Sequence, residues 1–300
     1  MPEGHTLHRL AHQMETLFIG LPWRVTSPQG RFEAGARRLN GRTPELAEAW
    51  GKHLFIHLGS DIWRVHLGLY GAFSFHGSRG FAAIPSLGAP RTAQEPEEIR
   101  RDRHGWVVPA APRGAVRARV RSRDGWADLR GPATCAVISA EDHDQILRTL
   151  GPDPLRQPGS GVESVALEQF CARLGRRRTS IAAALMDQSV IAGVGNIYRA
   201  EALFAERIDP ALAARDLCAE RTAALWLRLT SQLRDGVVEG TIRTFRPEDP
   251  QTHQLADPLP GHRRHWVYRH HGTPCLRCSE TIASRQVQGR TLFWCPGCQS

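Results

Sequence analysis

Apolar and polar positions alternate over short runs in roughly the first 130 residues, a pattern typical of half-buried β-strands. The runs Lys52–Leu58 and Ile62–Leu67 flank the polar triplet Gly59–Asp61, which predicts a β-hairpin with its turn at the triplet. The runs Ala72–Phe75 and Val116–Val120 continue the alternation. We therefore expect the N-terminal part of the chain to be built mainly from β-strands.

A helix is expected to open the chain, because apolar residues recur there at the spacing of one helix face. These residues are Leu7, Leu10, Ala11, Met14 and Leu17. The stretch Arg91–Pro112 is charged, contains prolines and has no clear period, so it is predicted to be a surface loop.

The pattern changes at Leu150–Gly161, where prolines and glycines crowd into a dozen residues. The stretch Ala140–Leu150 just before this boundary is predicted to be a short helix, and the chain after it is helical in character. Its longest predicted helix is Leu217–Val238. The apolar positions of that helix include Leu225, Leu229 and Leu233, at intervals of four residues.

Three shorter helices are predicted between the boundary and the long helix. The first has apolar positions from Val165 to Leu174, and the second runs from a cap at Thr179 or Ser180 to Met186. The third is Ile197–Ile208. A polar, proline-rich stretch, Pro247–Pro260, then leads to the cysteines near the end of the chain.

The charge balance indicates a polyanionic partner, since the formal net charge is +9 and the isoelectric point is near 9.8. No apolar run reaches the roughly 18 residues that a membrane span needs. The start, Met1–His5, lacks the basic and apolar regions of a signal peptide. We therefore expect a cytoplasmic protein without a membrane partner.

Lysine is nearly absent from this basic chain: of its 39 Lys and Arg residues, Lys52 is the only lysine. An ammonium group can shift its pKa and release a proton, which a guanidinium group cannot do. Lys52 is therefore a candidate for proton chemistry. The alternative is a lysine that persisted by chance in an arginine-rich composition.

Two CxxC pairs, Cys275/Cys278 and Cys295/Cys298, are separated by sixteen residues. Four thiolates in this spacing form the tetrahedral sulfur site that selects zinc, and a closed site of this kind is structural. We predict one zinc ion and a ribbon of two strands with Arg290 on the second, where an arginine suggests phosphate. Two disulfides in a secreted protein are the less favoured alternative.

The segment Asp187–Arg199 lies between two predicted helices and contains Gly193, Gly195 and Asn196. Glycines let backbone N–H groups approach a ligand closely, and a helix that begins near Asn196 points its positive end at the same space. This arrangement predicts an anion site, here a DNA phosphate site. The alternative is a plain turn between helices with Asn196 as the N-cap.

The first residues suggest covalent chemistry. Removal of Met1 would expose the secondary amine of Pro2, with a pKa near 8. Such an amine can attack a sugar C1′ and form a cationic iminium, and Glu3 beside it could donate or accept the proton. The alternative is an ordinary start of a chain with Glu3 as a first-turn helix charge.

The tetrapeptide Gly68–Gly71 places Leu69 and Tyr70 at a glycine-flanked strand end. Such a tip could enter a DNA duplex and fill the space that a flipped base leaves. Packing of both side chains in the protein core is the alternative.

Taken together, these residues resemble a known family, formamidopyrimidine-DNA glycosylase / endonuclease VIII, in the same order and over the whole chain. The start Met1–His5 and the Leu69–Tyr70 tip are more similar to the endonuclease VIII branch. The motifs that carry the resemblance are Met1–Gly4 (MPEG), Gly51–Lys52, Leu69–Gly71 (LYG), Leu150–Leu155 (LGPDPL), Asp187–Gln188, Ala192–Tyr198 (AGVGNIY), Glu201–Phe204 (EALF), Arg290 and Cys295–Gln299 (CPGCQ).

The resemblance implies an α+β multidomain fold. Its parts would be an N-terminal catalytic β-sandwich with flanking helices (1–150), a hinge linker (151–161), a helix–two-turn–helix DNA-binding domain (162–262) and a C-terminal four-cysteine zinc ribbon (263–300). The implied partner is damaged double-stranded DNA, bound between the two halves of a monomer and in association with the nucleoid. No nucleotide cofactor is expected.

The implied activity is that of a bifunctional DNA glycosylase/AP lyase in base excision repair. It would remove oxidised pyrimidines, and ring-opened purines, with β,δ-elimination. Pro2 would be the nucleophile that forms the Schiff base, and Glu3 the acid/base that opens the sugar ring. Lys52 would contact phosphate and assist proton transfer, and Arg290 would grip the phosphates next to the lesion.

The remaining implied roles concern DNA binding. Asn196, with the turn at Gly195, would clamp a phosphate, and Leu69 and Tyr70 would fill the void left by the flipped base. Gly68 stands where the family has a side chain that helps to fill this void, so we expect weaker discrimination of the opposite base.

Other departures concern Thr6, where the endonuclease VIII branch usually has Glu, and two missing features of the formamidopyrimidine branch. There is no convincing Arg-and-Phe wedge around Arg117–Trp126 and no readable lesion-capping loop in Arg243–His262. The alternative function is a non-catalytic DNA-binding protein that senses damage or structure. Intact Pro2 and Glu3 favour the enzyme, because binding alone needs no secondary amine. A zinc-ribbon transcription factor is a third alternative, which nothing in the N-terminal half supports.

Overall fold

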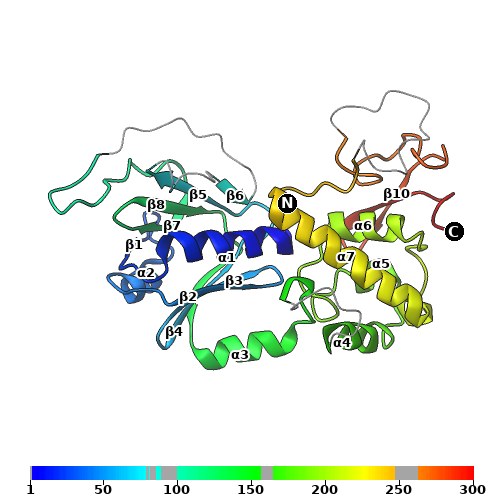
Figure 1. Cartoon of the computed structure of the whole chain (residues 1–300), viewed down its shortest axis with the longest axis horizontal. Coiled ribbons are helices and arrows are strands. Elements are labelled where there is room, and N and C mark those ends of the chain that lie inside the picture. The colour runs from blue at the N-terminus through cyan, green and yellow to red at the C-terminus, as the bar shows by residue number, and fades with distance from the viewer. Residues whose placement is uncertain (1, 79–80, 82–85, 89–99, 157–164, 247–262) are drawn as a thin grey trace. The chain divides into compact units, whose positions relative to one another are not determined.

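The computed structural model describes residues 2–78, 81, 86–88, 100–156, 165–246 and 263–300. Contacts divide the chain into two compact units, Met1–Arg148 and Thr149–Ser300 (Figure 1). Each unit has its own hydrophobic core. In the described ranges, no helix is both long and apolar enough to cross a membrane.

The first unit contains two antiparallel sheets. One has the strand order β1-β7-β8-β5-β6 and the other the order β2-β3-β4-β9. The strands of the first sheet are β1 (Arg24–Thr26), β7 (Val116–Arg121), β8 (Gly125–Arg130), β5 (Ala72–Gly77) and β6 (Ser86–Gly88). Those of the second are β2 (Leu46–Trp50), β3 (His53–Leu58), β4 (Asp61–His66) and β9 (Thr134–Ile138).

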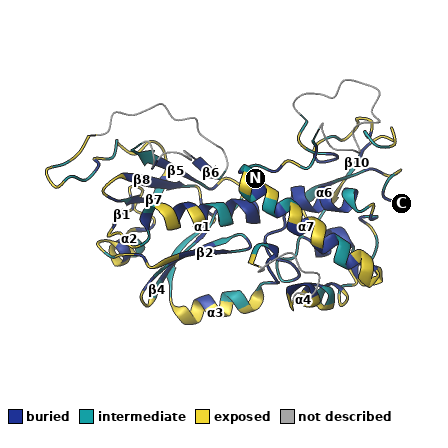
Figure 2. Ribbon diagram, viewed as in Figure 1, coloured by how far each residue is buried: buried dark blue, intermediate teal, exposed yellow. Residues whose placement is uncertain are grey.

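The two sheets pack face to face as a β-sandwich. The rings of Trp63 on β4 and Phe73 on β5 meet edge to face with centroids 6.1 Å apart. Side chains from the inner faces of both sheets form one hydrophobic core. Helix α1 (Gly4–Phe18) contacts β2 and β6, the edge strands of the two sheets, and so closes one open side of the sandwich. Figure 2 shows the buried and exposed stripes of this helix. Two further helices of this unit are α2 (Glu33–Leu39) and α3 (Ala140–Thr149).

In the second unit, the described residues before the ribbon form helices and connecting turns. The long helix α7 (Ala219–Glu239) buries Leu225, Leu229 and Leu233 completely, and Trp226 packs on Phe170 with ring centroids 5.3 Å apart. This four-residue periodicity on one face is why the segment forms an amphipathic helix. The elements are η1 (Pro154–Arg156), α4 (Val165–Leu174), α5 (Ile181–Ala184), α6 (Asn196–Ala205), η2 (Ala214–Asp216) and α7 (Ala219–Glu239).

The ribbon is a hairpin of β10 (Ala283–Val287) and β11 (Arg290–Trp294), with Val287 opposite Arg290. Leu292 on β11 and Ile282 just before β10 are fully buried and belong to the same core as the helices. A hairpin of this size buries little on its own, so the helices supply much of its apolar environment.

The predicted β-sandwich, the helical region and the hairpin from Lys52 to Leu67 are confirmed. Ser180 caps α5 by accepting a hydrogen bond from Ala183 N at 3.3 Å, but the helix ends at Ala184 and not at Met186. The side chain of Val165 is 70% exposed, although the apolar spacing places it on a buried face, because it is the first residue of α4.

The expected surface loop at 91–112 lies partly outside the described residues. Where it is described, Arg101 and Val107 form an isolated bridge, and the Val107 side chain is fully buried. This part of the loop is therefore held against the sandwich. The connection Pro247–Pro260 lies outside the described residues.

Candidate functional site

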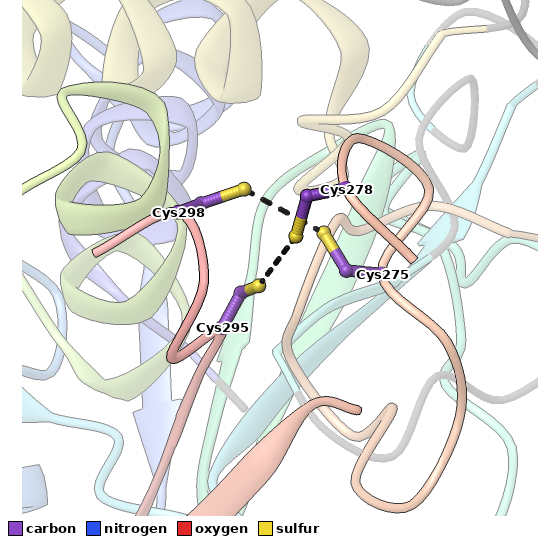
Figure 3. A group of neighbouring side chains, drawn as sticks. All are labelled: Cys275, Cys278, Cys295 and Cys298. Carbon is purple, nitrogen blue, oxygen red and sulfur yellow. Dashed lines mark hydrogen bonds between the residues drawn. The ribbon is translucent and has the colours of Figure 1, made fainter. Parts of the chain in front are cut away.

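Four cysteine side chains converge in the ribbon (Figure 3). The Sγ atoms of Cys278 and Cys295 are 3.3 Å apart, those of Cys275 and Cys298 are 3.9 Å apart, and all four lie within 4.8 Å of one another. None is joined in a disulfide. Four sulfurs around one zinc at about 2.3 Å would stand about 3.8 Å from each other. The cluster therefore fits one zinc ion.

Main-chain hydrogen bonds preform the first knuckle. Cys275 N donates to Glu280 O, and Ser279 N donates to Cys275 O, both at 2.8 Å. Burial, reinforced by the neighbouring thiols, raises the pKa of Cys295 to about 11. A thiol with a raised pKa ionises at neutral pH only beside a cation, so Cys295 suits a divalent metal that displaces its proton.

The two predicted phosphate-binding residues of the second unit are linked through Thr291. Asn196 is the first residue of α6, and its Nδ2 donates to the carbonyl of Thr291 at 2.9 Å. Arg290, which precedes Thr291, is half-buried at the start of β11. The side chain of Asn196 therefore ties the ribbon strand to the start of α6, and Arg290 is held beside that helix end.

The turn before α6 is held by the side-chain amide of Gln188. Its Nε2 donates to Val194 O at 3.0 Å, and its Oε1 accepts from Gly193 N at 3.0 Å. Gly193 has φ +93°, which explains the glycine there, whereas Gly195 has φ −128°. Gly195 is the N-cap of α6 and Asn196 follows it, so the alternative in which Asn196 caps the helix is wrong.

Glu201 anchors the chain where it enters the ribbon. Its carboxylate is fully buried and accepts three main-chain N–H bonds, from Trp266 at 2.7 Å, Val267 at 2.9 Å and Tyr268 at 2.8 Å. The hydroxyl of Thr244 also donates to it. A buried carboxylate needs such donors, and the bonds that it forms are stronger than neutral ones.

Replacing Glu201 by Gln should lower the free energy of unfolding by about 3 kcal/mol, because an NH₂ group then faces main-chain N–H groups and a charged acceptor is lost. Urea unfolding followed by circular dichroism would measure this. The matched control is Glu206→Gln, since Glu206 pairs at 2.7 Å with Arg228, whose side chain is 45% exposed. That change should cost less than about 1 kcal/mol. Equal losses in the two variants would contradict the anchoring role.

In the first unit, Pro2 and Glu3 are buried at the N-terminal end of α1. Glu3 stands at the N-cap position in extended conformation, and its carbonyl accepts from Thr6 N at 2.9 Å. The hydroxyl of Thr6 lies 3.1 Å from Nε2 of His5. The helix end thus holds the first residues in one place, with the dipole of α1 favouring negative charge on Glu3.

The turn that carries Lys52 lies toward the same end of α1. Glu15, near the C-terminal end of the helix, accepts from Ala47 N at 2.7 Å near the start of β2, and Gly20 N donates to Pro44 O at 2.9 Å. Helix and strand therefore run in opposite directions. A helix rises about 1.5 Å per residue and a strand about 3.3 Å per residue. The distance from Glu15 back to the N-terminus of α1 is therefore similar to the distance from Ala47 forward to the end of β2, so these two ends lie near each other.

Lys52 itself is half-buried in the two-residue turn Gly51–Lys52, since Trp50 pairs with His53 across the hairpin. Gly51 has φ +56°, the conformation that such a tight turn requires and that glycine adopts at least cost.

Two histidines beside this turn are neutral. The rings of His53 and His66 have centroids 4.9 Å apart. Burial, the repulsion that would arise between the two protonated rings, and the charges of Arg64 and Lys52 lower the pKa of His53 to about 3. Burial, Lys52 and Arg64 also lower the pKa of His66. The positive charge near the turn is therefore carried by Lys52 and Arg64.

The tip after β4 is exposed. Leu69 and Tyr70 are 36% and 74% exposed, so the alternative of core packing is wrong. Gly68 has φ +67°, and a Cβ there would lie 2.9 Å from Cβ of Ala133. A side chain at this position would therefore be strained and crowded, which gives a steric reason for the glycine. Weaker discrimination of the opposite base stays a prediction.

The segment Arg117–Trp126, in which no wedge was recognised, forms β7, a short turn closed by Ser122 N donating to Gly125 O at 2.8 Å, and the start of β8. Of Arg243–His262, residues 247–262 lie outside the described residues.

The structure thus groups the predicted residues within each unit. Pro2, Glu3 and Lys52 belong to one end of the α1–β2 pair, and Asn196 at the start of α6 bonds to Thr291, the neighbour of Arg290. Sequence reasoning gave no role to Glu201. The available signal was a charged residue within the apolar pattern of Ile197–Ile208.

Comparisons with known proteins agree with this architecture. Residues 1–113 match the family model of the formamidopyrimidine-DNA glycosylase N-terminal domain, and residues 150–246 match that of the formamidopyrimidine-DNA glycosylase H2TH domain. Endonuclease 8 1 of Mycobacterium tuberculosis (strain ATCC 25618 / H37Rv) is 41% identical over 301 residues, covering 100% of both chains. Formamidopyrimidine-DNA glycosylase of Rhodopseudomonas palustris (strain TIE-1) is 32% identical over 270 residues, 88% of this chain and 86% of the relative.

Solved structures have the same fold. The crystal structure of the MutM (Fpg) protein from Thermus thermophilus superimposes with a TM-score of 0.70 at 26% identity, over 99% of this chain and 98% of that one. The Lactococcus lactis Fpg in complex with DNA that contains an abasic site gives a TM-score of 0.72 at 19% identity, over 99% of each chain. With full-length identity of 41% to an endonuclease 8, this chain belongs to the formamidopyrimidine-DNA glycosylase / endonuclease VIII family of DNA-repair enzymes, which are DNA glycosylases with AP lyase activity.

Proposed function

We propose that this enzyme removes oxidised pyrimidines, and ring-opened purines, from duplex DNA through a Schiff base at Pro2, followed by β,δ-elimination. The observation that carries the proposal is the placement of Pro2 and Glu3 at one end of α1, toward which the opposed run of β2 also brings Lys52. A nucleophile, an acid/base and a cation are the groups that this chemistry needs.

In the first step, the lone pair of the Pro2 nitrogen attacks C1′ of the damaged nucleotide, and the bond between C1′ and the base breaks. The departing base takes a proton from solvent. The Glu3 carboxylate accepts the N–H proton of Pro2 and passes it to O4′ as the C1′–O4′ bond opens, which leaves an iminium between C1′ and Pro2. A secondary amine gives an iminium that is cationic at every pH, so it withdraws electrons from C2′ without further protonation.

In the second step, a proton-accepting group (a general base) removes a proton from C2′, and the bond from C3′ to its phosphate oxygen breaks. Loss of a proton from C4′ and of the 5′ phosphate follows, which leaves a one-nucleotide gap flanked by phosphates. We assign contact with a phosphate and assistance in proton transfer to Lys52, since an ammonium group can do both. Because His53 and His66 are neutral, their imidazoles add no positive charge beside the ammonium group of Lys52.

DNA binding is assigned to three places. The α6 start, with Gly195 and Asn196, would bind a backbone phosphate through main-chain N–H groups, and Arg290 would bind the phosphates next to the lesion. Leu69 and Tyr70 would enter the DNA duplex and take the place of the flipped base. The net charge of +9 supports an electrostatic contribution to affinity that weakens with salt.

The zinc ion of the ribbon would have a structural role only, because four cysteines leave no coordination position open. We further propose that the protein works as a monomer, without a nucleotide cofactor, in the cytoplasm and in association with the nucleoid.

Borohydride trapping tests the proposed function. Duplexes that carry thymine glycol, dihydrouracil, 8-oxoguanine or an abasic site are incubated with the enzyme and reduced, which turns an iminium into a stable covalent link. Trapping with an oxidised pyrimidine is expected. Trapping with the abasic site alone would reduce the activity to that of a lyase, and DNA binding without any trapping, in protein shown by mass to lack Met1, would favour the non-catalytic alternative.

We expect Leu69→Ala and Tyr70→Ala to slow base excision from duplex DNA about 5- to 30-fold, which corresponds to about 1 to 2 kcal/mol of activation free energy. The reason is that no side chain then occupies the space that the flipped base leaves in the duplex. Cleavage at a preformed abasic site should change much less, since no base has to be extruded. Single-turnover assays on both substrates would measure this. Leu21→Ala is the matched control, as Leu21 is 46% exposed. An equal loss on both substrates would argue against void filling.

A further inference from the structure

The outer face of the four-stranded sheet in the first unit holds a second group of metal-ligating side chains. Glu48 lies on β2, His57 on β3 and His143 on α3. Their ligand atoms all lie within 4.8 Å of one another. The catalytic proposal uses none of these residues.

The three groups converge on one point. Nε2 of His57 is 2.9 Å from Oε1 of Glu48, and Nε2 of His143 is 3.7 Å from the same oxygen. Around a tetrahedral zinc with bonds of about 2.0 to 2.1 Å, ligand atoms stand about 3.3 to 3.4 Å apart. The two distances bracket this separation, so small side-chain rotations would place all three donors around one ion.

A carboxylate also lies near the other nitrogen of the His143 ring. Nδ1 is 3.6 Å from Oδ1 of Asp144, longer than a hydrogen bond. A carboxylate on this side of the ring is the group that commonly orients a metal-ligating histidine. The ring also packs edge to face on Phe55, with centroids 4.5 Å apart, and on His57, with centroids 5.4 Å apart. The two ring contacts limit how far the imidazole of His143 can turn away from Glu48.

The sheet register explains how the residues share a face. Glu48 pairs with Phe55 and Leu46 pairs with His57, so Glu48 and His57 are diagonal neighbours on one face of the β2–β3 ladder. The intervening Ala47 and Ile56 point into the core. Helix α3 lies over the same face, since His143 contacts Phe55 of β3.

We propose that Glu48, His57 and His143 form a second zinc site, separate from the four cysteines, that ties α3 to the outer face of the sheet. Two imidazoles and one carboxylate are a ligand set that zinc takes in proteins, with a water molecule in the remaining position. The site is partly open, as the Glu48 and His57 side chains are 20% and 21% exposed. An ion could therefore enter from solvent and exchange.

Zinc stoichiometry tests this directly. The full chain is first dialysed against a chelator too weak to empty the cysteine site, and Zn²⁺ alone is then titrated in, with native mass spectrometry and calorimetry as readouts. The wild type should rise from one to two ions per chain. Glu48→Gln and His143→Gln should each weaken the second ion at least about tenfold, since each removes one of three ligands. The control His12→Ala changes an exposed histidine and should bind two ions.

Hydrogen exchange keeps the test decisive if a variant folds poorly. In the wild type, added Zn²⁺ should slow exchange in Ala140–Thr149 and His53–Leu58 at least about tenfold, because the ion binds only the closed arrangement. Glu48→Gln should show the same exchange as the wild type without zinc and no response to it. Uptake of a single ion by the wild type, or an unchanged second ion in the Glu48 and His143 variants, would overturn the proposal. Trapping activity is not expected to depend on these residues.

Discussion

Replacing Pro2 by glycine is expected to slow formation of the borohydride-trapped complex at least about 100-fold, which corresponds to about 2.7 kcal/mol of activation free energy. The glycine amine is primary, so its imine must gain a proton before it can act as an electron sink. It also loses the ring that fixes the direction of the nitrogen lone pair. The measurement is the single-turnover rate of trapping, on an abasic site and on an oxidised pyrimidine.

The comparison with Glu3→Gln separates the two roles at this helix end. Glu3→Gln should stop base excision while leaving cleavage of a preformed abasic site, because the glutamine keeps the shape of the side chain but cannot supply the proton. Intact mass must show that Met1 is absent from every variant. Because Pro2 is buried, circular dichroism must show that the Pro2 variant is folded. Undiminished trapping in Pro2→Gly would place the nucleophile elsewhere.

Replacing Cys295 by serine should release the zinc of the ribbon and reduce cleavage at least about 100-fold, although no chemistry is assigned to the ribbon itself. Structural zinc contributes about 10 to 16 kcal/mol in small zinc-binding peptides, far more than the buried Ile282 and Leu292 can replace. Without the ion, the bond between Asn196 and Thr291 is expected to open, so Arg290 loses its position. Chelator-resistant zinc per chain, measured by elemental analysis, and the cleavage rate are the two readouts.

The matched control is Cys218→Ser. Cys218 is exposed at the N-cap of α7 and forms no side-chain cap, and serine is a good cap residue. This variant should keep both zinc and activity. Full cleavage by a Cys295→Ser protein shown to lack the ribbon zinc would remove the phosphate role from Arg290.

Local periodicity predicted the elements that bury a long, regular face. The spacing of Leu225, Leu229 and Leu233 identified α7, and all three are fully buried. At the end of α1 the same reasoning chose Leu17, which is half-buried, and passed over Phe18, which is fully buried. Phe18 faces Trp23 and Phe81 beyond the helix, at ring centroid distances of 6.1 and 5.3 Å, and a helical period contains no information about those partners.

Strands β6 and β9 were not predicted. Strand β6 (SLG) has only three residues, and β9 (TCAVI) is a short apolar run, so neither shows the alternation of apolar and polar residues that marks a strand. Both form because they add hydrogen bonds to the side of an existing strand, β6 to β5 and β9 to β4. The order of strands in a sheet depends on such distant pairing, which propensity does not encode.

What the sequence determined by itself was chemistry that depends on residue type and close spacing. Two CxxC pairs specify a sulfur site, and a lone lysine, a proline beside Glu3 and a glycine-flanked Leu-Tyr pair mark candidate groups whatever their surroundings. Tertiary structure alone decided which of these groups meet and which side chains support them. Asn196 reaches Thr291 across 95 residues, and His57 and His143 converge on Glu48 from a strand and a helix. Such contacts arise when separate hydrophobic faces pack against one another, and no pattern within a single segment reveals its partner.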